Sequence, residues 1–97
     1  MTTASAVVIG GGIVGTSIAH YLAAKGLSDV LLLERDTIAE HATGKTGGLI
    51  RMHYTNPHDT ALALRSREVY TGWEDEIGGD AGFHSTGFLF IVGHDDR

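Results

Sequence analysis

A glycine-rich turn near the start of the chain constrains its fold more than any other feature. Residues 7–9 are apolar and β-branched, which predicts a short strand. The sequence GGGIVG at residues 10–15 follows at once and contains the spacing Gly-x-Gly-x-x-Gly. Residues 13–25 then have helical spacing, and a Gly directly after them predicts the end of the helix. A second apolar run at residues 30–33, closed by Glu34, completes a strand–helix–strand unit.

Each glycine of this turn has a physical role in nucleotide binding. Gly10 lets the chain turn sharply, Gly12 lets a diphosphate approach the backbone, and Gly15 lets the helix pack on the strand. The N–H groups and the dipole at the helix start favour an anion. Glu34 follows at roughly the 20-residue distance where such folds place an acid that binds an adenosine ribose. The pattern therefore predicts a Rossmann-like dinucleotide site, without distinguishing NAD from FAD.

Composition and charge exclude several classes of function. The net charge is −5 and no basic stripe is present, which argues against nucleic-acid binding. The absence of cysteines excludes disulfides and Cys-ligated metals, and the 6 histidines lack the close pairs of a metal site. No apolar run is long enough to span a membrane, and the N-terminus lacks a secretory signal. We therefore expect no metal, no membrane span and a cytoplasmic location.

The predicted sheet is incomplete. Parallel sheets are normally buried on both faces, and a dinucleotide fold needs more strands than the first unit supplies. The chain also stops directly after a strand-like run. We therefore expect an N-terminal piece of a longer enzyme or a truncated product, completed by the remaining part of the enzyme or by another subunit.

A second glycine-rich segment follows at residues 41–48. Its hydroxyls, backbone donors and single cation have the composition of a second cofactor contact, although a solvated surface loop would have them too. The sequence Gly44-Lys45-Thr46 resembles the end of a phosphate-binding P-loop, but Ala39 stands where that motif needs its first Gly. We therefore do not expect a nucleoside triphosphatase site here.

The rest of the chain predicts one helix and one strand. Helical spacing runs over residues 58–77, with Trp73 on the apolar face as a packing residue, and Pro57 suits the helix start. Residues 83–92 then read as a β segment. Arg51 lies in a mostly apolar stretch, where it either binds a substrate carboxylate or forms a structural ion pair; spacing alone favours the ion pair.

Three segments together resemble a known family. Residues 7–36 resemble the FAD-binding start of the D-amino-acid oxidase, glycine oxidase and sarcosine oxidase superfamily. Residues 42–51 resemble the loop by which sarcosine-oxidase-like members reach the flavin, and residues 83–89 are similar to the strand that begins their substrate domain. The resemblance implies an α/β fold with a partial FAD-binding domain at residues 1–82 and a truncated substrate domain at residues 83–97.

The resemblance also implies FAD as the cofactor. Its diphosphate, ribose, adenine and flavin contacts would come from Gly10, Gly12, Ile13, Val14, Gly15, Glu34, Arg35, Thr43, Thr46, Gly47, Gly48 and Leu49. In that set Glu34 would bind the ribose and Arg35 would lie by the adenine. Some relatives attach FAD through a His where this chain has Lys45, which implies non-covalent FAD here.

The implied activity is oxidation of the C–N bond of an amino acid or secondary amine by hydride transfer to the flavin. Arg51 matches a family arginine that helps bind the substrate carboxylate, which makes that role as strong a candidate as the ion pair. Gly48 replaces a basic residue of monomeric sarcosine oxidases, and no catalytic residue is identifiable in this chain. Two alternatives remain: a non-catalytic nucleotide-binding fragment that needs another chain, and an NAD-linked dehydrogenase.

Overall fold

The computed structural model describes residues 3–96 of the chain. The chain divides into two compact units, Met1–Gly48 and Leu49–Arg97, and each is described by itself. The predicted domain boundary between residues 82 and 83 remains a prediction.

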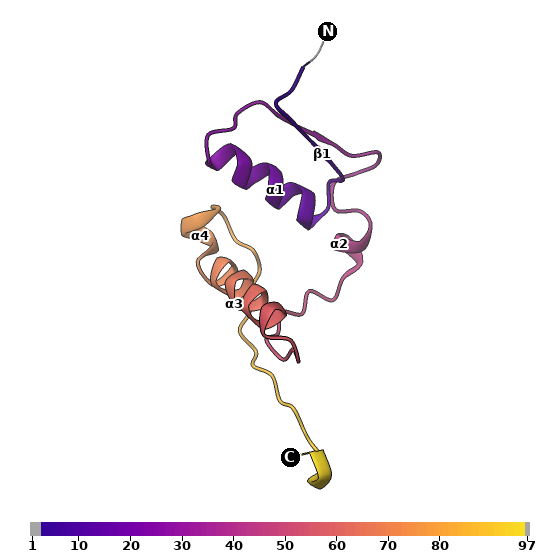
Figure 1. Cartoon of the computed structure of the whole chain (residues 1–97), viewed down its shortest axis with the longest axis vertical. Coiled ribbons are helices and arrows are strands. Elements are labelled where there is room, and N and C mark those ends of the chain that lie inside the picture. Colours follow the sequence, from indigo (N-terminus) through magenta and orange to yellow (C-terminus); the bar gives the residue numbers. More distant parts are fainter. Residues whose placement is uncertain (1–2, 97) are drawn as a thin grey trace. The chain divides into compact units, whose positions relative to one another are not determined.

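The first unit contains the predicted strand–helix–strand. Strand β1 (Ala6–Ile9) leads into helix α1 (Ile13–Ala24), and strand β2 (Val30–Leu33) follows. The strands pair in parallel, with Ala6 opposite Val30 and Ile9 opposite Leu33. Helix α1 packs against both strands, as Figure 1 shows. The mixed α/β fold and its open, two-stranded sheet are therefore confirmed.

Helix α1 ends where the Gly signal predicts. Lys25 is the C-cap, and Gly26 follows it with a φ of 97°. The N–H of Gly26 donates to the carbonyl of Ala23 at 2.9 Å, and the N–H of Leu27 donates to the carbonyl of Leu22 at 3.0 Å. These two bonds form a Schellman motif, which satisfies carbonyls that the helix end leaves without partners.

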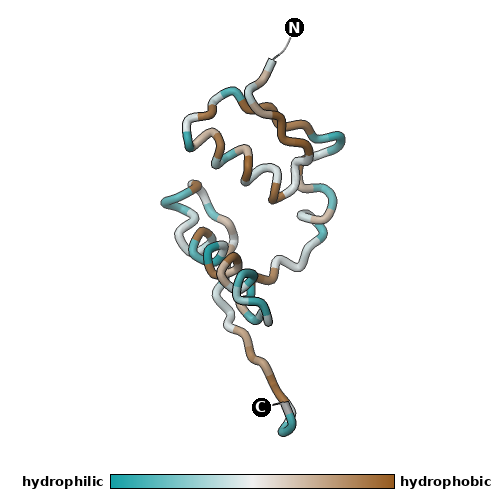
Figure 2. The backbone as a smooth tube through the Cα atoms, viewed as in Figure 1, coloured by the Kyte–Doolittle hydropathy of each residue, from teal (hydrophilic) through white to brown (hydrophobic). Residues whose placement is uncertain are grey.

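One face of the sheet is bare. The side chain of Val8 points towards α1, since a Cβ on Gly15 would lie 3.4 Å from it. On the opposite face Ile9 is 85% exposed, and Val7, Leu31 and Leu33 are also exposed. In Figure 2 both strands have the brown colour of hydrophobic residues. No hydrophobic side chain in the described part of the chain is fully buried, so this sheet has no closed core.

The second glycine-rich segment is more ordered than predicted. The composition of residues 41–48 predicts a flexible loop, but helix α2 (Ala42–Lys45) forms within them. Gly44 favours this turn because a Cβ at that position would collide with the carbonyl of Ala39. Only residues 42–45 differ from the predicted loop, since α2 is a single helical turn.

The second unit is mainly helical. Helix α3 (Pro57–Thr71) starts at the predicted proline, and the side chain of its N-cap Asn56 accepts from the N–H of His58 at 2.8 Å. The helix predicted over residues 58–77 is divided, because Gly72 ends α3 and a separate turn, α4 (Trp73–Glu76), follows. Glycine is a poor helix former, which accounts for the break.

Trp73 packs within the second unit, as predicted. Its ring stacks on Tyr70 at 5.4 Å between centroids, and Tyr70 lies 5.9 Å from Phe83. The indole N–H donates to the carbonyl of Gly78 at 3.1 Å. These contacts join α3, α4 and the segment that follows.

The strand predicted over residues 83–92 does not form. This segment runs without a ladder partner among the described residues and leads to a short 3₁₀ helix, η1 (His94–Asp96). Phe88 and Phe90 contact the His53 ring at 4.6 and 5.7 Å, whereas Leu89 and Ile91 are 81% and 85% exposed. The apolar character is that of a strand, but pairing needs a neighbour that residues 3–96 do not supply.

Replacing Gly15 with Ala tests the close packing of α1. A Cβ at Gly15 would collide with the carbonyl of Gly10, so we expect Gly15→Ala to lower the free energy of unfolding by roughly 1–3 kcal/mol. Thermal and urea unfolding followed by circular dichroism measure this change. Gly47→Ala is the matched control, because its Cβ would meet open space. Equal stability of Gly15→Ala and wild type would contradict the packing.

Candidate functional site

The glycine turn joins β1 to α1 through a conformation that other residues rarely adopt. Gly10 has a φ of 108°, and its N–H donates to the carbonyl of Leu33 at 2.8 Å. The carbonyl of Gly10 lies where a Cβ of Gly15 would stand. Both ends of the turn are therefore fixed: a hydrogen bond holds its start to β2, and its end packs against α1.

A shallow cleft of about 170 Å³ opens beside Gly12. Its lining comes from the turn, from the end of β2 and from the segment before and within α2: Gly12, Glu34, Ala39, Glu40, His41, Ala42 and Thr43. A side chain at position 12 would narrow the cleft, since its Cβ would lie only 3.0 Å from Oγ1 of Thr43. Glycine at this position keeps that space open. A ligand in this cleft reaches the main chain directly.

The N-terminus of α1 faces the same side. The N–H of Ile13 donates to Oγ1 of Thr43 at 2.9 Å, although Thr43 lies on α2 and not in the preceding turn. The first turn of α1 carries no acidic side chain. The helix dipole therefore keeps its partial positive charge at this point, which suits a phosphate.

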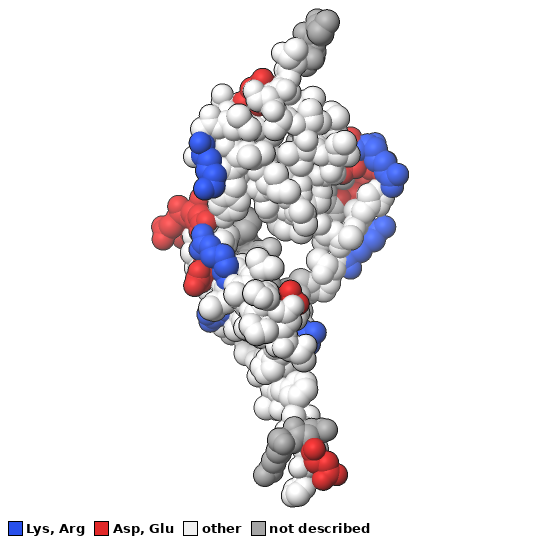
Figure 3. Space-filling view, viewed as in Figure 1, with Lys and Arg blue, Asp and Glu red and all other residues white. Residues whose placement is uncertain are grey.

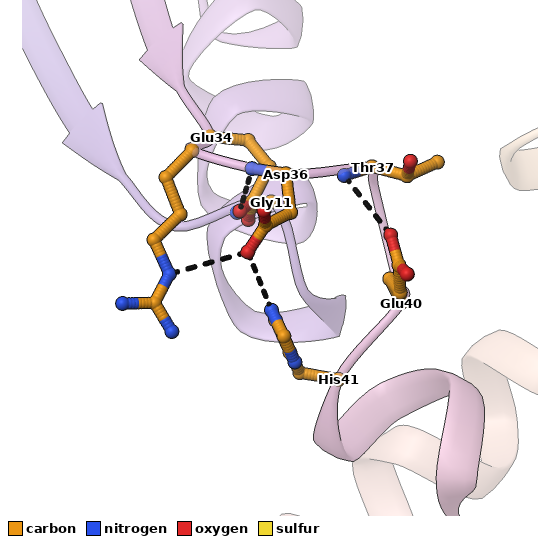
Figure 4. A network of polar contacts seen from close by, with 7 residues as sticks. Gly11, Glu34, Asp36, Thr37, Glu40 and His41 are labelled. Atoms are coloured by element: carbon orange, nitrogen blue, oxygen red, sulfur yellow. Dashed lines mark hydrogen bonds and ion pairs between the residues drawn. The ribbon is translucent and has the colours of Figure 1, made fainter.

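Glu34 connects the glycine turn to the chain after β2. Its Oε2 accepts from the N–H of Gly11 at 2.7 Å, and its Oε1 accepts from the N–H of Asp36 at 2.9 Å (Figure 4). The N–H groups of Asp36 and, next, of Gly11 lower the pKa of this carboxyl below its ordinary value of 4.5. Each carboxylate oxygen has a second lone pair, so both remain able to accept from ribose hydroxyls.

Residues 36–45, which we call the strap, lie against the glycine turn. The N–H of Ala39 donates to the carbonyl of Gly11 at 3.0 Å. Ala39 has a φ of 64°, a left-handed conformation that is uncommon outside glycine. Gly44 approaches the Ala39 carbonyl so closely that no Cβ fits. The strap is thus shaped by backbone contacts to the turn.

A charged network covers the outer side of the strap. The Asp36 carboxylate lies 2.9 Å from Nε2 of His41 and 3.3 Å from Nε of Arg35 (Figure 4). Arg35 is 84% exposed, so these ion pairs are solvent-screened and contribute little to stability. The arginine side chain contacts Asp36, and its predicted place beside the adenine remains a prediction.

The structure brings together many of the predicted site residues. Gly10, Gly12, Ile13, Gly15, Glu34 and Thr43 meet around the turn and the cleft. Val14 is exposed on the first turn of α1. Thr46, Gly47 and Gly48 follow α2 on the exposed surface, where Oγ1 of Thr46 accepts from the N–H of Gly48 at 3.2 Å.

Leu49 and Arg51 belong to the second unit and are described with it. The Arg51 guanidinium lies 5.5 Å from the centre of the Tyr54 ring. Within residues 3–96 it forms no ion pair, so the structural pairing that its spacing favoured is not formed. Its role towards a substrate remains a prediction.

Sequence reasoning missed three contributors to the site. Gly11, Ala39 and Glu40 line or hold the cleft, although no predicted contact included them. The triple Gly was the available signal for Gly11, because a Cβ there would lie 3.1 Å from the Glu34 side chain. Nothing in the local sequence indicates the left-handed turn at Ala39.

Other classes of site find no support in the described residues. No group of three or more His, Asp or Glu side chains among them could hold a metal ion. In that same part of the chain, no helix has the length and apolarity that crossing a bilayer requires. Figure 3 shows Lys and Arg interspersed with Asp and Glu on the face drawn, without a continuous basic stripe.

The site is suited to one end of a dinucleotide. The bare backbone at Gly12 and the dipole at α1 can receive a diphosphate, and the Glu34 carboxylate can accept from a ribose. These are the kinds of groups that the diphosphate and ribose of a dinucleotide such as FAD require, so the chemistry of the residues present suits that portion of the cofactor.

Comparison with known proteins agrees with this geometry. The profile of the family described as FAD dependent oxidoreductase matches residues 5–97. The chain is 36% identical over 89 residues to dimethylglycine dehydrogenase, mitochondrial, of Homo sapiens, covering 92% of the chain and 10% of that protein. It is 35% identical over 97 residues to sarcosine dehydrogenase, mitochondrial, of Homo sapiens, covering 99% and 11%.

A third relative carries a different kind of name. The chain is 32% identical over 94 residues to the pyruvate dehydrogenase phosphatase regulatory subunit, mitochondrial, of Mus musculus, covering 97% of the chain and 11% of that protein. The chain thus spans about a tenth of the length of these relatives. No solved structure matches it.

Glu34→Gln tests the carboxylate bridge. An amide has one acceptor oxygen, so its NH₂ would face the N–H of either Gly11 or Asp36, and we expect adenosine diphosphate to bind about tenfold more weakly. Isothermal titration measures the affinity. Glu74→Gln is the matched control, since Glu74 lies on α4 and outside the residues that line the cleft. Equal losses in both variants would contradict the bridge.

The same carboxylate predicts a pH dependence. Its pKa is lowered in the folded chain, so its stabilising contribution is complete above the ordinary value of 4.5 and is lost as the pH falls through the folded pKa. We expect the melting temperature of the wild type to fall below that pH more steeply than that of Glu34→Gln. Parallel acid profiles of the two proteins would contradict this assignment.

Proposed function

This chain belongs to the family of FAD-dependent oxidoreductases, and we propose that its first unit binds the adenosine diphosphate end of FAD. The observation that carries the proposal is the cleft at Gly12, bordered by the start of α1 and by the Glu34 carboxylate. Backbone N–H groups of the turn would hold the diphosphate, and Glu34 would accept from the ribose hydroxyls.

The proposed reaction is the oxidation of a methylated amine or amino acid. Dimethylglycine dehydrogenase and sarcosine dehydrogenase, two relatives of this chain, are named for such substrates. FAD, when bound, supplies the acceptor for the hydride taken from the carbon beside the nitrogen. The residues of this chain would bind and orient the cofactor, and the catalytic groups are not assigned to it.

Arg51 is the proposed contact for a substrate carboxylate. Its guanidinium contacts an aromatic ring and no carboxylate within the described residues, so its hydrogen-bond donors are not taken up by an ion pair there. A planar guanidinium matches a carboxylate with two parallel hydrogen bonds. We propose non-covalent FAD, because Lys45 stands where some relatives have a flavin-linked His.

Residues 83–97 would begin a substrate domain, and their exposed apolar side chains support a further layer packed against them. A cytoplasmic location also remains a prediction, although the three relatives above are named as mitochondrial.

A second candidate function is non-catalytic. The alternative is a nucleotide-binding fragment that needs another chain, and one relative is named as a regulatory subunit. The two functions make different predictions, because only an enzyme would reduce its bound flavin when a methylated amine is added.

Ligand titration of the purified protein tests the proposed function. We expect FAD and adenosine diphosphate to bind in place of each other, and NADH to bind more weakly. Gly12→Val should weaken adenosine diphosphate binding by at least about tenfold, because its side chain would fill the cleft against Thr43. Gly72→Ala serves as control, since its Cβ would make only an ordinary contact of 3.4 Å. Tight NADH binding without FAD binding would favour an NAD-linked dehydrogenase.

Arg51→Gln tests the substrate role in an FAD-loaded enzyme that joins this segment to its catalytic part, because we expect the segment alone to be inactive. Loss of a charge-assisted contact should raise the KM for sarcosine or dimethylglycine about 10- to 100-fold, with a smaller effect on kcat. Initial rates with an artificial electron acceptor measure both constants. Arg67→Gln on α3 is the control, and equal KM values for Arg51→Gln and wild type would rule out the carboxylate contact.

A further inference from the structure

Thr43 occupies the place that the proposed ligand needs. Its hydroxyl oxygen accepts from the N–H of Ile13 at 2.9 Å, at the first residue of α1. It also lies 3.0 Å from the position of a Cβ on Gly12, inside the space that this glycine leaves open. A phosphate oxygen that used the same N–H would need the same space.

A backbone N–H has a single hydrogen, so it makes one well-aligned hydrogen bond at a time. The Ile13 N–H can donate to Thr43 or to a ligand oxygen, and the ligand oxygen carries charge. Charge-assisted bonds are roughly twice as strong as neutral ones, and the α1 dipole adds to this preference. A phosphate therefore displaces the hydroxyl, provided that Thr43 can move.

Hydrogen bonds hold the strap more firmly near Asp36 and Ala39 than at Thr43. Ala39 donates to the Gly11 carbonyl, and Glu34 holds the N–H groups of Gly11 and Asp36. Thr43 lies on α2, which has four residues and no side-chain cap. The contact to Ile13 can thus open by a movement of α2 while the Ala39 end of the strap stays in place.

We propose that Thr43 is a self-cap: it closes the diphosphate site in the free chain and leaves when the cofactor binds. This inference rests on the proposed function, because the displacing group is the diphosphate of FAD. In the free chain the self-cap satisfies the Ile13 N–H at the start of α1. The ligand must break this contact, so its affinity is reduced by the free energy of one N-cap contact. Thr43 then sets the affinity of the site without being needed as a ligand contact.

A different arrangement makes the opposite prediction. A hydroxyl both accepts and donates, so Thr43 could keep its bond to Ile13 and donate its own hydrogen to the phosphate. In that case Thr43 would hold the cofactor, and its removal would weaken binding. The sign of the change in affinity separates the two arrangements.

Thr43→Val and Thr43→Ser test the self-cap, with adenosine diphosphate as the probe. Valine keeps the shape and removes the acceptor, so we expect about fivefold tighter binding, the equivalent of one lost N-cap contact. The same variant without ligand should melt a few degrees lower. Serine keeps the hydroxyl and should bind as the wild type does. Thr71→Val is the matched control, because its hydroxyl donates to the carbonyl of Glu68 within α3 and does not contact α1.

Amide NMR spectra supply a readout that is independent of activity. The Ile13 amide signal should differ between wild type and Thr43→Val without ligand and should coincide once adenosine diphosphate is bound. Weaker or unchanged binding by Thr43→Val would overturn the self-cap while leaving the cofactor site intact. If neither wild type nor variants bind adenosine diphosphate or FAD, the proposed function fails, and the self-cap fails with it.

Discussion

The contact between the Glu34 carboxylate and two backbone N–H groups is the interaction on which the site depends. It joins the glycine turn at Gly11 to the chain beyond β2 at Asp36. Without it, the strap would be positioned mainly by the Ala39 bond and the Thr43 contact. An acid that sequence patterns assign to ribose binding is therefore also the residue that shapes the cleft before any ribose arrives.

Sequence reasoning succeeded where structure is local. The β1–α1–β2 unit, the Gly stop after α1 and the proline start of α3 all depend on neighbouring residues, and each formed as predicted. The spacing within this unit also singled out Glu34, which contacts the glycine turn, whereas its binding of a ribose remains a prediction. Periodicity and turn chemistry carry this information directly, because they act over a few residues.

The failures have a different physical origin. The apolar run from Phe83 to Val92 resembles a strand, but a strand exists only through pairing with a distant segment, and the described residues provide none. The predicted helix is divided at Gly72, because the apolar periodicity on which the prediction rested takes no account of the low helix propensity of glycine. The strap was missed because the left-handed Ala39 is stabilised by contacts to the turn, which no local pattern encodes.

The hydrogen bonds that shape the cleft lie within one continuous segment of the sequence, so the site can in principle be moved as one segment. The hydrogen bonds described above for the turn and the cleft join residues between Gly10 and Thr43, and the sheet beside them consists of β1 and β2. The segment from Ala6 to Lys45 is thus a self-contained cassette that carries its own turn, acid and cap. If it were grafted onto another parallel sheet that covers the bare face of Ile9 and Leu33, the proposed function predicts that it would transfer the recognition of one half of a cofactor without the chemistry of the other half.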